Sequence, residues 1–471
     1  MFIGRKRELA VLNSGYARNT YGCIVLYGRR RVGKTALINE FRKDKPSIVF
    51  SALKGGERDN LRELSRVISE YQYGLGSGEP ATFPDFRSAL VAVSRLAENT
   101  RMVFCIDELP YLAASIPSSL SVLQHFLDNE AKEKKLFIIL SGSSMSFMEE
   151  GVLSEKSPLY GRRTGQIRLQ PFDYLECAQW FPSFSTEDKA FLYGITGGVP
   201  YYMECFTKAG SIREAVIESV LSPSGLLYEE PSFLLREELR DSFIYDSLIR
   251  AIAEGRTRMS EISSALGIET GMCSTYMKSL IELGFVRKET PVGKNGGRKT
   301  LYRIDDFFLL FWFRFVYRFS SSIASGRGED VYDRIICSEI NEYMGLVFER
   351  MVRDFILKYA ATPFLIGQIG RWWGGNPRTH KEAEIDVVAV SAQDKQEGII
   401  ASCKYRNRQT DVNVLALMKE YGDAMNLLEK RHYWFFSRGG FSPAMSAQAG
   451  ENVKLFSLED LYKADQGISS H

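Results

Sequence analysis

The segment Gly28–Thr35 constrains the fold more than any other part of this sequence, because it fits the phosphate-binding pattern G-x-x-x-x-G-K-[ST]. The apolar run Cys23–Tyr27 before it has the length of a buried strand, and Ala36–Phe41 after it reads as a helix. Backbone N–H groups at a helix N-terminus, together with the helix dipole, favour a bound anion. The segment therefore predicts a phosphate-binding loop between a strand and a helix of an α/β fold. The alternative is an accidental glycine-rich turn.

Two residues of this loop have predicted chemical roles. Lys34 is expected to neutralise the β- and γ-phosphates, and the hydroxyl of Thr35 is expected to ligate Mg²⁺. The predicted cofactors are thus ATP and Mg²⁺. The predicted nucleotide-binding residues of the loop are Gly28, Arg29, Arg30, Arg31, Val32, Gly33, Lys34, Thr35 and Ala36.

A second apolar run, Met102–Ile106, ends in the two carboxylates Asp107 and Glu108. Such a run is typical of a central parallel strand, and acidic residues at its carboxyl end face the ligand crevice. We expect Asp107 to hold Mg²⁺, usually through water, and Glu108 to polarise the attacking water. The alternative is a strand that ends in two solvated acids.

Further polar residues follow later strands. Ser143 comes after the strand predicted over Leu136–Leu140 and is expected to sense the attacking water or the γ-phosphate, although a plain polar turn is an alternative. Arg162 and Arg163 precede a strand predicted over Gln166–Leu169 and are candidates for an arginine finger that reaches a neighbouring subunit. The alternative is a surface arginine pair. Helices between residues 173 and 221 are predicted to form a lid, interrupted by a Gly-Gly-Val-Pro turn at 197–200.

Several of these motifs together resemble the archaeal-type ATPase family, a P-loop family related to the AAA+ and signal-transduction ATPases. The residues that carry the resemblance are Phe2, Ile3, Gly4 and Arg5 with Glu8, the loop 28–35, Asp107, Glu108, the segment 141–144 and the turn 197–200. The resemblance spans about the first half of the chain. It implies that Phe2, Ile3, Gly4 and Arg5 bracket the adenine, and that the lid turn with Pro200 closes over the nucleotide.

From Asp241 the pattern changes to three short helices, predicted over 243–253, 259–266 and 271–283, and two strands, predicted over 285–288 and 300–304. This order is typical of a winged helix-turn-helix. Its third helix offers Thr270, Ser274, Thr275 and Lys278 to a DNA groove, and its wing offers Lys288, Lys294, Arg298 and Lys299 to phosphates. DNA is therefore a predicted partner. Protein docking and a merely solvated hairpin are the alternatives.

The last part of the chain reads as a helix over 340–359, strands over 384–390 and 398–404, a helix over 412–428 and a strand over 433–437. This order, with Glu349, Asp386 and Lys404 at these places, resembles the PD-(D/E)xK nuclease fold and the domain that commonly follows archaeal-type ATPases. Carboxylates around Mg²⁺ and a nearby lysine are the chemistry of such a site. The acid expected two residues before Lys404 is Ser402, which favours a degenerate site. Glu384 is a candidate replacement, because strand alternation places it on one face with Asp386.

Composition limits the remaining possibilities. A chain of 471 residues is too long for one hydrophobic core. Its net charge of +2 argues neither for nor against nucleic acid, so any basic patch is local. The seven cysteines are dispersed and form no C-x-x-C pair, which suggests neither a disulfide framework nor zinc and favours a reducing cytoplasm. We expect no signal peptide and no membrane span.

These observations predict an α/β protein with a P-loop parallel-sheet ATPase core, a helical lid, a winged helix-turn-helix and an α/β restriction-endonuclease-like domain. The predicted bounds are 1–170 for the core, 171–238 for the lid, 239–306 for the winged helix, 307–330 for a helix and linker, and 331–471 for the nuclease-like domain. The predicted function is ATP hydrolysis coupled to action on DNA, with a homo-oligomer as a possibility. The alternative is an ATP-dependent regulatory switch that works through protein contacts, with a catalytically degenerate nuclease-like domain.

Overall fold

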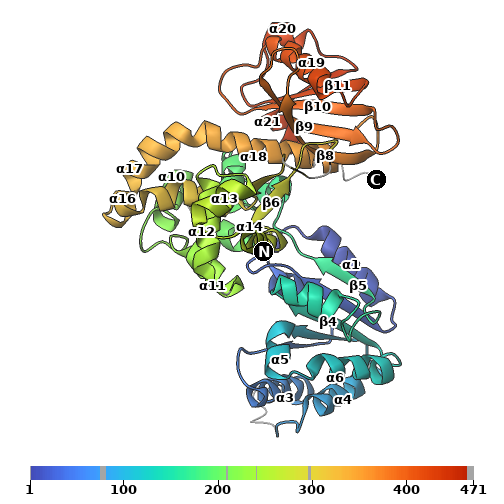
Figure 1. Ribbon diagram of the computed structural model, residues 1–471. Helices are drawn as coiled ribbons and strands as arrows, with labels where there is room; N and C mark the ends of the chain where they lie inside the picture. Colours follow the sequence, from blue (N-terminus) through green and yellow to red (C-terminus); the bar gives the residue numbers. More distant parts are fainter. Residues whose placement is uncertain are drawn as a thin grey trace. The chain divides into compact units, whose positions relative to one another are not determined.

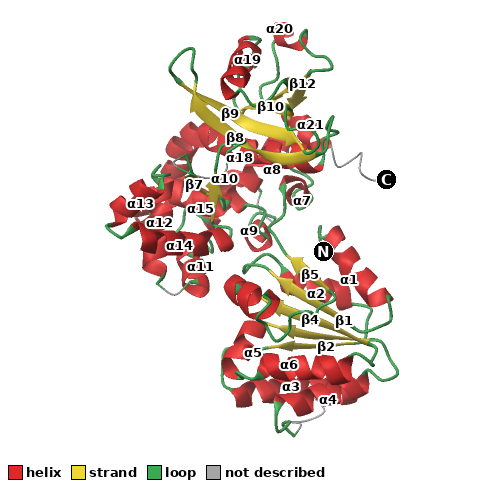
Figure 2. Cartoon of the chain, turned by 45° about the vertical axis from the view of Figure 1, so that its right-hand side comes forward, coloured by secondary structure: helices red, strands yellow, loops and turns green. Residues whose placement is uncertain are grey.

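The computed structural model describes residues 2–74, 81–207, 210–239, 241–294, 297 and 299–463. Arg298, one of the predicted wing cations, lies outside these residues. The chain forms two compact units, Met1–Pro171 and Phe172–His471. Figures 1 and 2 label helices and strands of both units where there is room. Within the described ranges, no helix is both long enough and apolar enough to cross a membrane.

The first unit is built on a five-stranded parallel sheet with the strand order β2-β3-β4-β1-β5. Strands β1, β3 and β4 are buried along their whole length, as their continuous apolar sequences predict. The strands are β1 Gly22–Tyr27, β2 Ser47–Ser51, β3 Met102–Asp107, β4 Leu136–Gly142 and β5 Gly165–Arg168. The parallel order brings the carboxyl ends of β1, β3 and β4 to one edge, which is where the predicted loop and carboxylates lie.

Helices complete the first unit. They are α1 Lys6–Ala17, α2 Lys34–Arg42, α3 Glu57–Tyr73, α4 Phe86–Leu96, α5 Leu109–Ser115 and α6 Ser119–Phe126, with π-helical turns at Leu127–Ala131 and Phe147–Leu153. One core cluster joins Leu12 of α1 and Phe41 of α2 to Ile24, Val103 and Phe137 of the sheet. This packing fixes α2 against β1 and so fixes the loop that joins them.

The second unit begins with short helices, which occupy the region predicted as a lid. They are α7 Tyr174–Ala178, α8 Thr186–Thr196, α9 Pro200–Glu204, α10 Ile212–Ser219 and α11 Glu230–Glu238. The turn between α8 and α9 depends on Gly198, which has φ 70°. The amide of Phe172 donates to the carbonyl of Gly198 at 2.8 Å, so two backbone segments meet there.

Replacing Gly198 with alanine is expected to lower the free energy of unfolding of the second unit by about 2 kcal/mol or more. An added Cβ would lie 2.0 Å from the carbonyl oxygen of Phe172, and the residue would also be held in the left-handed region. Gly267 is the matched control, because it has φ 65° but no atom within 4 Å of an added Cβ. Gly267→Ala should cost only the backbone strain, roughly 1–2 kcal/mol. Urea denaturation followed by circular dichroism measures both, and equal losses would contradict the prediction.

Three helices and a hairpin follow in the order predicted from the sequence. They are α12 Ser242–Ala253, α13 Met259–Leu266, α14 Thr270–Glu282, and the antiparallel pair β6 Val286–Glu289 and β7 Leu301–Ile304. Helix α14 buries Cys273, Met277 and Leu280 along one side. In the turn of the hairpin, Val292 is buried in the core cluster of the C-terminal sheet. The hairpin is therefore packed against that sheet.

Within the region predicted as a helix and linker, 307–330, Ser320–Ala324 form helix α16 and Ile323 is fully buried. Serines have middling helix propensity, so tertiary packing of a single apolar residue decides the local structure. Around α16 the chain is helical throughout, in α15 Phe307–Phe311, π and 3₁₀ turns at Trp312–Val316 and Tyr317–Phe319, α17 Gly328–Asp330 and a further π turn at Val331–Ile336.

The C-terminal part contains a second five-stranded sheet, in the order β12-β11-β10-β9-β8. Strands β8, β9 and β10 are antiparallel, whereas β10, β11 and β12 are parallel. The elements are α18 Cys337–Lys358, β8 Ile366–Gly375, β9 Glu382–Ser391, β10 Glu397–Lys404, α19 Asn413–Met425, β11 Lys430–Ser437, α20 Pro443–Ser446, β12 Val453–Ser457 and α21 Leu458–Lys463. The helix–strands–helix–strand order agrees with the prediction. Strands β8 and β12 were not predicted.

Candidate nucleotide-binding site

The loop 28–33 joins the end of β1 directly to α2, which begins at Lys34. Gly33 caps the helix with φ 91°, a backbone conformation that favours glycine. At Gly28 an added Cβ would lie 2.4 Å from the carbonyl oxygen of Leu169, so only glycine fits between the loop and the end of β5. The two glycines that the pattern requires are thus needed for different reasons. Gly33 is needed for its backbone conformation, and Gly28 is needed because a side chain would not fit.

The side chain of Lys34 lies back across the loop. Its Nζ donates to the carbonyl oxygens of Gly28 at 2.8 Å and Arg29 at 3.1 Å, and the residue is buried. This places a positive charge within the ring of the loop, beside the start of α2. A phosphate held by the loop would meet both the ammonium and the positive end of the helix dipole.

The two predicted Mg²⁺ ligands lie together although 72 residues separate them in the sequence. The hydroxyl of Thr35 donates to Oδ2 of Asp107 at 3.0 Å, and Asp107 is buried at the carboxyl end of β3. The hard oxygen atoms of a hydroxyl and a carboxylate suit Mg²⁺. These two residues therefore fit the predicted metal.

Glu108 and Ser143 contact each other beside this pair. Ser143 donates from its hydroxyl to Oε2 of Glu108 at 2.8 Å and from its backbone N–H at 3.3 Å. Glu108 itself has φ 53°, the left-handed region that a glutamate rarely occupies. A strained residue held by two hydrogen bonds is typical of a functional position. The sequence predicted both residues at this site but not their contact.

The N-terminal segment also reaches the loop. Arg5 is buried, and its Nη2 donates to the carbonyl of Val32 at 3.0 Å. Phe2 packs against the core cluster that contains Val32, and Ile3 and Gly4 are half-buried between Phe2 and Arg5. A contact that sequence reasoning missed joins Arg30 of the loop to the hydroxyl of Tyr111 in α5, just after Glu108.

The two finger candidates lie at the other edge of the sheet. They precede β5, which runs parallel to β1, so they lie at the amino ends of the strands, whereas the loop follows the carboxyl end of β1. Arg162 forms an ion pair with Asp128 at 2.8 Å, and Arg163 donates to the carbonyl of Leu153 at 3.0 Å. Pro200, the last nucleotide-binding candidate, begins α9 in the second unit.

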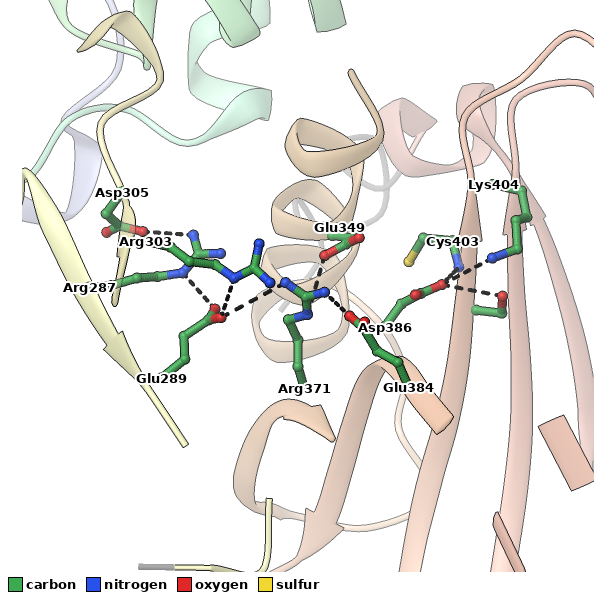
Figure 3. A network of polar contacts seen from close by, with 11 residues as sticks. Arg287, Glu289, Arg303, Asp305, Glu349, Arg371, Glu384, Asp386, Cys403 and Lys404 are labelled. Carbon is green, nitrogen blue, oxygen red and sulfur yellow. Dashed lines mark hydrogen bonds and ion pairs between the residues drawn. The ribbon is translucent and has the colours of Figure 1, made fainter. Parts of the chain in front are cut away.

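The predicted nuclease-like residues gather in the C-terminal part (Figure 3). Asp386 of β9 accepts from the backbone N–H of Cys403 at 2.7 Å and from the hydroxyl of Ser402 at 3.3 Å, and pairs with Lys404 at 3.5 Å. The carboxylate of Glu384, the candidate replacement for the acid missing at Ser402, pairs with Arg371. Trp372, in the neighbouring strand β8, is buried.

Glu349 of α18 pairs with Arg371 at 3.7 Å. Burial raises the pKa of Glu349 to about 7, because the charged form loses solvation, and the positive charge of Arg371 opposes part of that rise. Among the described residues, no group of three or more histidine, cysteine, aspartate and glutamate side chains could hold a metal ion. The carboxylates predicted for a nuclease-like centre, Glu349, Glu384 and Asp386, form ion pairs with cations of the chain.

Comparison with known proteins identifies the family. Residues 2–206 match the ATPase domain predominantly from Archaea, and residues 312–415 match a group of archaeal and bacterial proteins of unknown function. An uncharacterized protein of Methanocaldococcus jannaschii is 32% identical over 401 residues, which cover 84% of this chain and 86% of that protein. The chain belongs to this archaeal-type P-loop ATPase family.

Two further comparisons concern the ATPase part and the fold. An uncharacterized ATP-binding protein of the same organism is 51% identical over 45 residues, which are 10% of this chain and 76% of that protein. The solved Walker-type ATPase of Pyrococcus abyssi is 22% identical, with a TM-score of 0.50, and the match covers 66% of this chain and 96% of that one. The likeness to this solved structure shows that the chain has an α/β fold with a parallel-sheet P-loop core.

Proposed function

We propose that this archaeal-type ATPase binds ATP with Mg²⁺ at Gly28–Thr35 and hydrolyses it. The observation that carries the proposal is the convergence of Thr35, Asp107, Glu108 and Ser143 at the edge of the sheet where the loop lies. A phosphate cradle alone binds a nucleotide. A carboxylate held next to it is what hydrolysis needs.

Each residue has a role in this proposal. The loop amides and Lys34 hold the phosphates, and Thr35 and Asp107 would hold Mg²⁺, which neutralises charge on the phosphate oxygens. Glu108 accepts a hydrogen bond from the attacking water and draws its proton. Ser143 fixes the direction of the Glu108 carboxylate through the 2.8 Å hydrogen bond. Phe2, Ile3, Gly4 and Arg5, with Pro200, are proposed to surround the base. A trans role of Arg162 or Arg163 in a homo-oligomer, and a cytoplasmic location, remain predictions.

For the output we propose duplex DNA, bound by α12, α13, α14 and the hairpin as a winged helix. The support is the distribution of exposed groups. Helix α14 exposes Thr270, Ser274, Thr275 and Lys278, and the hairpin exposes Lys288, Lys294 and Lys299. Hydroxyl and ammonium groups of this kind contact phosphates and base edges.

The test is fluorescence anisotropy of a labelled duplex with the full chain, between about 50 and about 200 mM salt. We expect binding that weakens steeply with salt and a faster ATP turnover in the presence of DNA. Lys278→Ala and Lys288→Ala should each weaken binding and reduce the salt slope by about 1. Lys43→Ala, a change at an exposed lysine just after α2 in the first unit, is the matched control and should leave binding unchanged.

Salt-independent or absent DNA binding, with the same ATP turnover with and without duplex, would overturn this output. It would favour the second candidate, a regulatory switch that works through protein contacts. One observation favours that candidate now, namely that the carboxylates of the nuclease-like part pair with internal cations and, within the described residues, form no metal-binding group.

A further inference from the structure

Arg371 lies at the centre of a set of carboxylates that come from three elements (Figure 3). Its guanidinium pairs with Glu349 of α18 through Nε at 3.7 Å, with Glu289 of β6 through Nη1 at 3.9 Å, and with Glu384 of β9 through Nη2. Its side chain is only 12% exposed. A single buried cation is thus shared by carboxylates of the hairpin, the long helix and the sheet.

The backbone explains why Arg371 points into this set. The register between β8 and β9 shifts between Gly370 and Trp372, so the irregularity falls at Arg371. Such bulges redirect a side chain and locally interrupt strand pairing. The carbonyl of Arg371 accepts from the amide of Val292 at 2.9 Å, which attaches the turn of the hairpin at the same position. The position of Arg371 is therefore fixed from two sides.

The carboxylates of this set are paired with cations of the chain itself. Among the described residues, four carboxylates of this region form ion pairs with four cations, one of which, Arg287, also pairs with Asp305. The carboxylates are Glu289, Glu349, Glu384 and Asp386, and the cations are Arg287, Arg303, Arg371 and Lys404. A divalent cation bound by these carboxylates would lie close to the Arg371 guanidinium, whose positive charge would repel it.

We propose that the guanidinium of Arg371 is the resident cation of this carboxylate set and excludes divalent metal ions from it. As a result, no metal ion binds to the three carboxylates that were predicted to hold one, Glu349, Glu384 and Asp386. Glu289 contributes to this exclusion, because it places a hairpin carboxylate on the same guanidinium. Arg371 then links the C-terminal sheet to the hairpin through its ion pair with Glu289. This inference concerns the second unit and does not depend on ATP hydrolysis.

The test is Mn²⁺ titration of the full chain, followed by the loss of the free-ion electron paramagnetic resonance signal. All proteins carry Asp107→Asn and contain no nucleotide, so that the predicted metal ligands of the first unit do not contribute. The chain with Arg371 intact is expected to leave Mn²⁺ free. Arg371→Met, which keeps the bulk and removes the charge, should bind Mn²⁺ at least about 100-fold more tightly.

Two further variants identify the cause. Arg371→Lys keeps a cation and should stay without Mn²⁺ binding, whereas adding Asp386→Asn to Arg371→Met should abolish the binding gained. Circular dichroism and thermal melting establish that each variant is folded. A folded Arg371→Met protein that binds no more Mn²⁺ than its parent would overturn the proposal. Mn²⁺ binding by the chain with Arg371 intact, lost on Asp386→Asn, would overturn it even if Arg371→Met did not fold.

Discussion

The substitution Lys34→Ala is expected to lower the catalytic efficiency of ATP hydrolysis, kcat/KM, by about 100-fold or more. The ammonium donates inside the loop, to Gly28 and Arg29, and is the predicted cationic partner of the phosphates. Charge-assisted hydrogen bonds of this kind each contribute about 1.5–3 kcal/mol, and a donor aimed at charge that develops in the transition state is worth 10²–10³-fold in rate. Steady-state phosphate release measures the loss of kcat/KM. Equilibrium binding of a fluorescent ATP analogue measures the loss of nucleotide affinity separately.

Because Lys34 is buried, its replacement also removes two hydrogen bonds of the loop itself. Lys43→Ala tests the loss of an exposed lysine just after the same helix, where the side chain pairs with the neighbouring Glu40 at 2.5 Å. It should leave turnover and the melting temperature unchanged. If Lys34→Ala melts like the parent protein and still hydrolyses ATP at the parent rate, Lys34 does not bind the phosphates.

Much of the first unit could be predicted because its signals are local. Continuous apolar runs identified β1, β3 and β4, and the rule that parallel strands share a carboxyl edge placed Asp107 near Thr35. Their 3.0 Å hydrogen bond agrees with that expectation. The glycines of the loop were predicted by pattern, whereas the close approach of Leu169 to Gly28 came only from the fold.

The rest depends on contacts between distant segments. Strand β8 contains Gly367, Gly370, Gly374 and Gly375, which conceal the strand signal, so nothing in the sequence indicated that Arg371 would face Glu349 and Glu289. Period-two alternation correctly placed Glu384 and Asp386 on one face of β9. It could not show that a guanidinium from the neighbouring strand takes up the carboxylate of Glu384.

The contact between Glu108 and Ser143 could not be predicted either, because it also joins segments that are distant in the sequence. The sequence gives each residue a place at the end of a strand, but a hydrogen bond between side chains 35 residues apart depends on the left-handed backbone at Glu108. That geometry changes the predicted role of the serine. Ser143 acts on the carboxylate in this structure, so its effect on catalysis is proposed to pass through Glu108.

Glu108→Gln is expected to lower kcat by about 10²–10⁴-fold while ATP binding remains within a few-fold of the parent. The amide oxygen of glutamine accepts the Ser143 hydrogen bond, so the local structure is retained, but the neutral amide cannot take a proton from water. Single-turnover hydrolysis measures the chemical step, and filter binding measures retained ATP. The double result, bound nucleotide without product, distinguishes a catalytic carboxylate from one that only shapes the loop.

Glu133→Gln, at an exposed glutamate between the π-helical turn at 127–131 and β4, is the matched control and should hydrolyse ATP at the parent rate. Ser143→Ala separates orientation from chemistry, because it leaves the carboxylate of Glu108 in place and removes the 2.8 Å hydrogen bond. It should lower kcat less than Glu108→Gln does, by the roughly tenfold that corresponds to one hydrogen bond to a charged group. Unchanged hydrolysis in Glu108→Gln would exclude this residue from the mechanism. A Ser143→Ala loss as large as that of Glu108→Gln would instead show that the serine contacts the reacting groups directly.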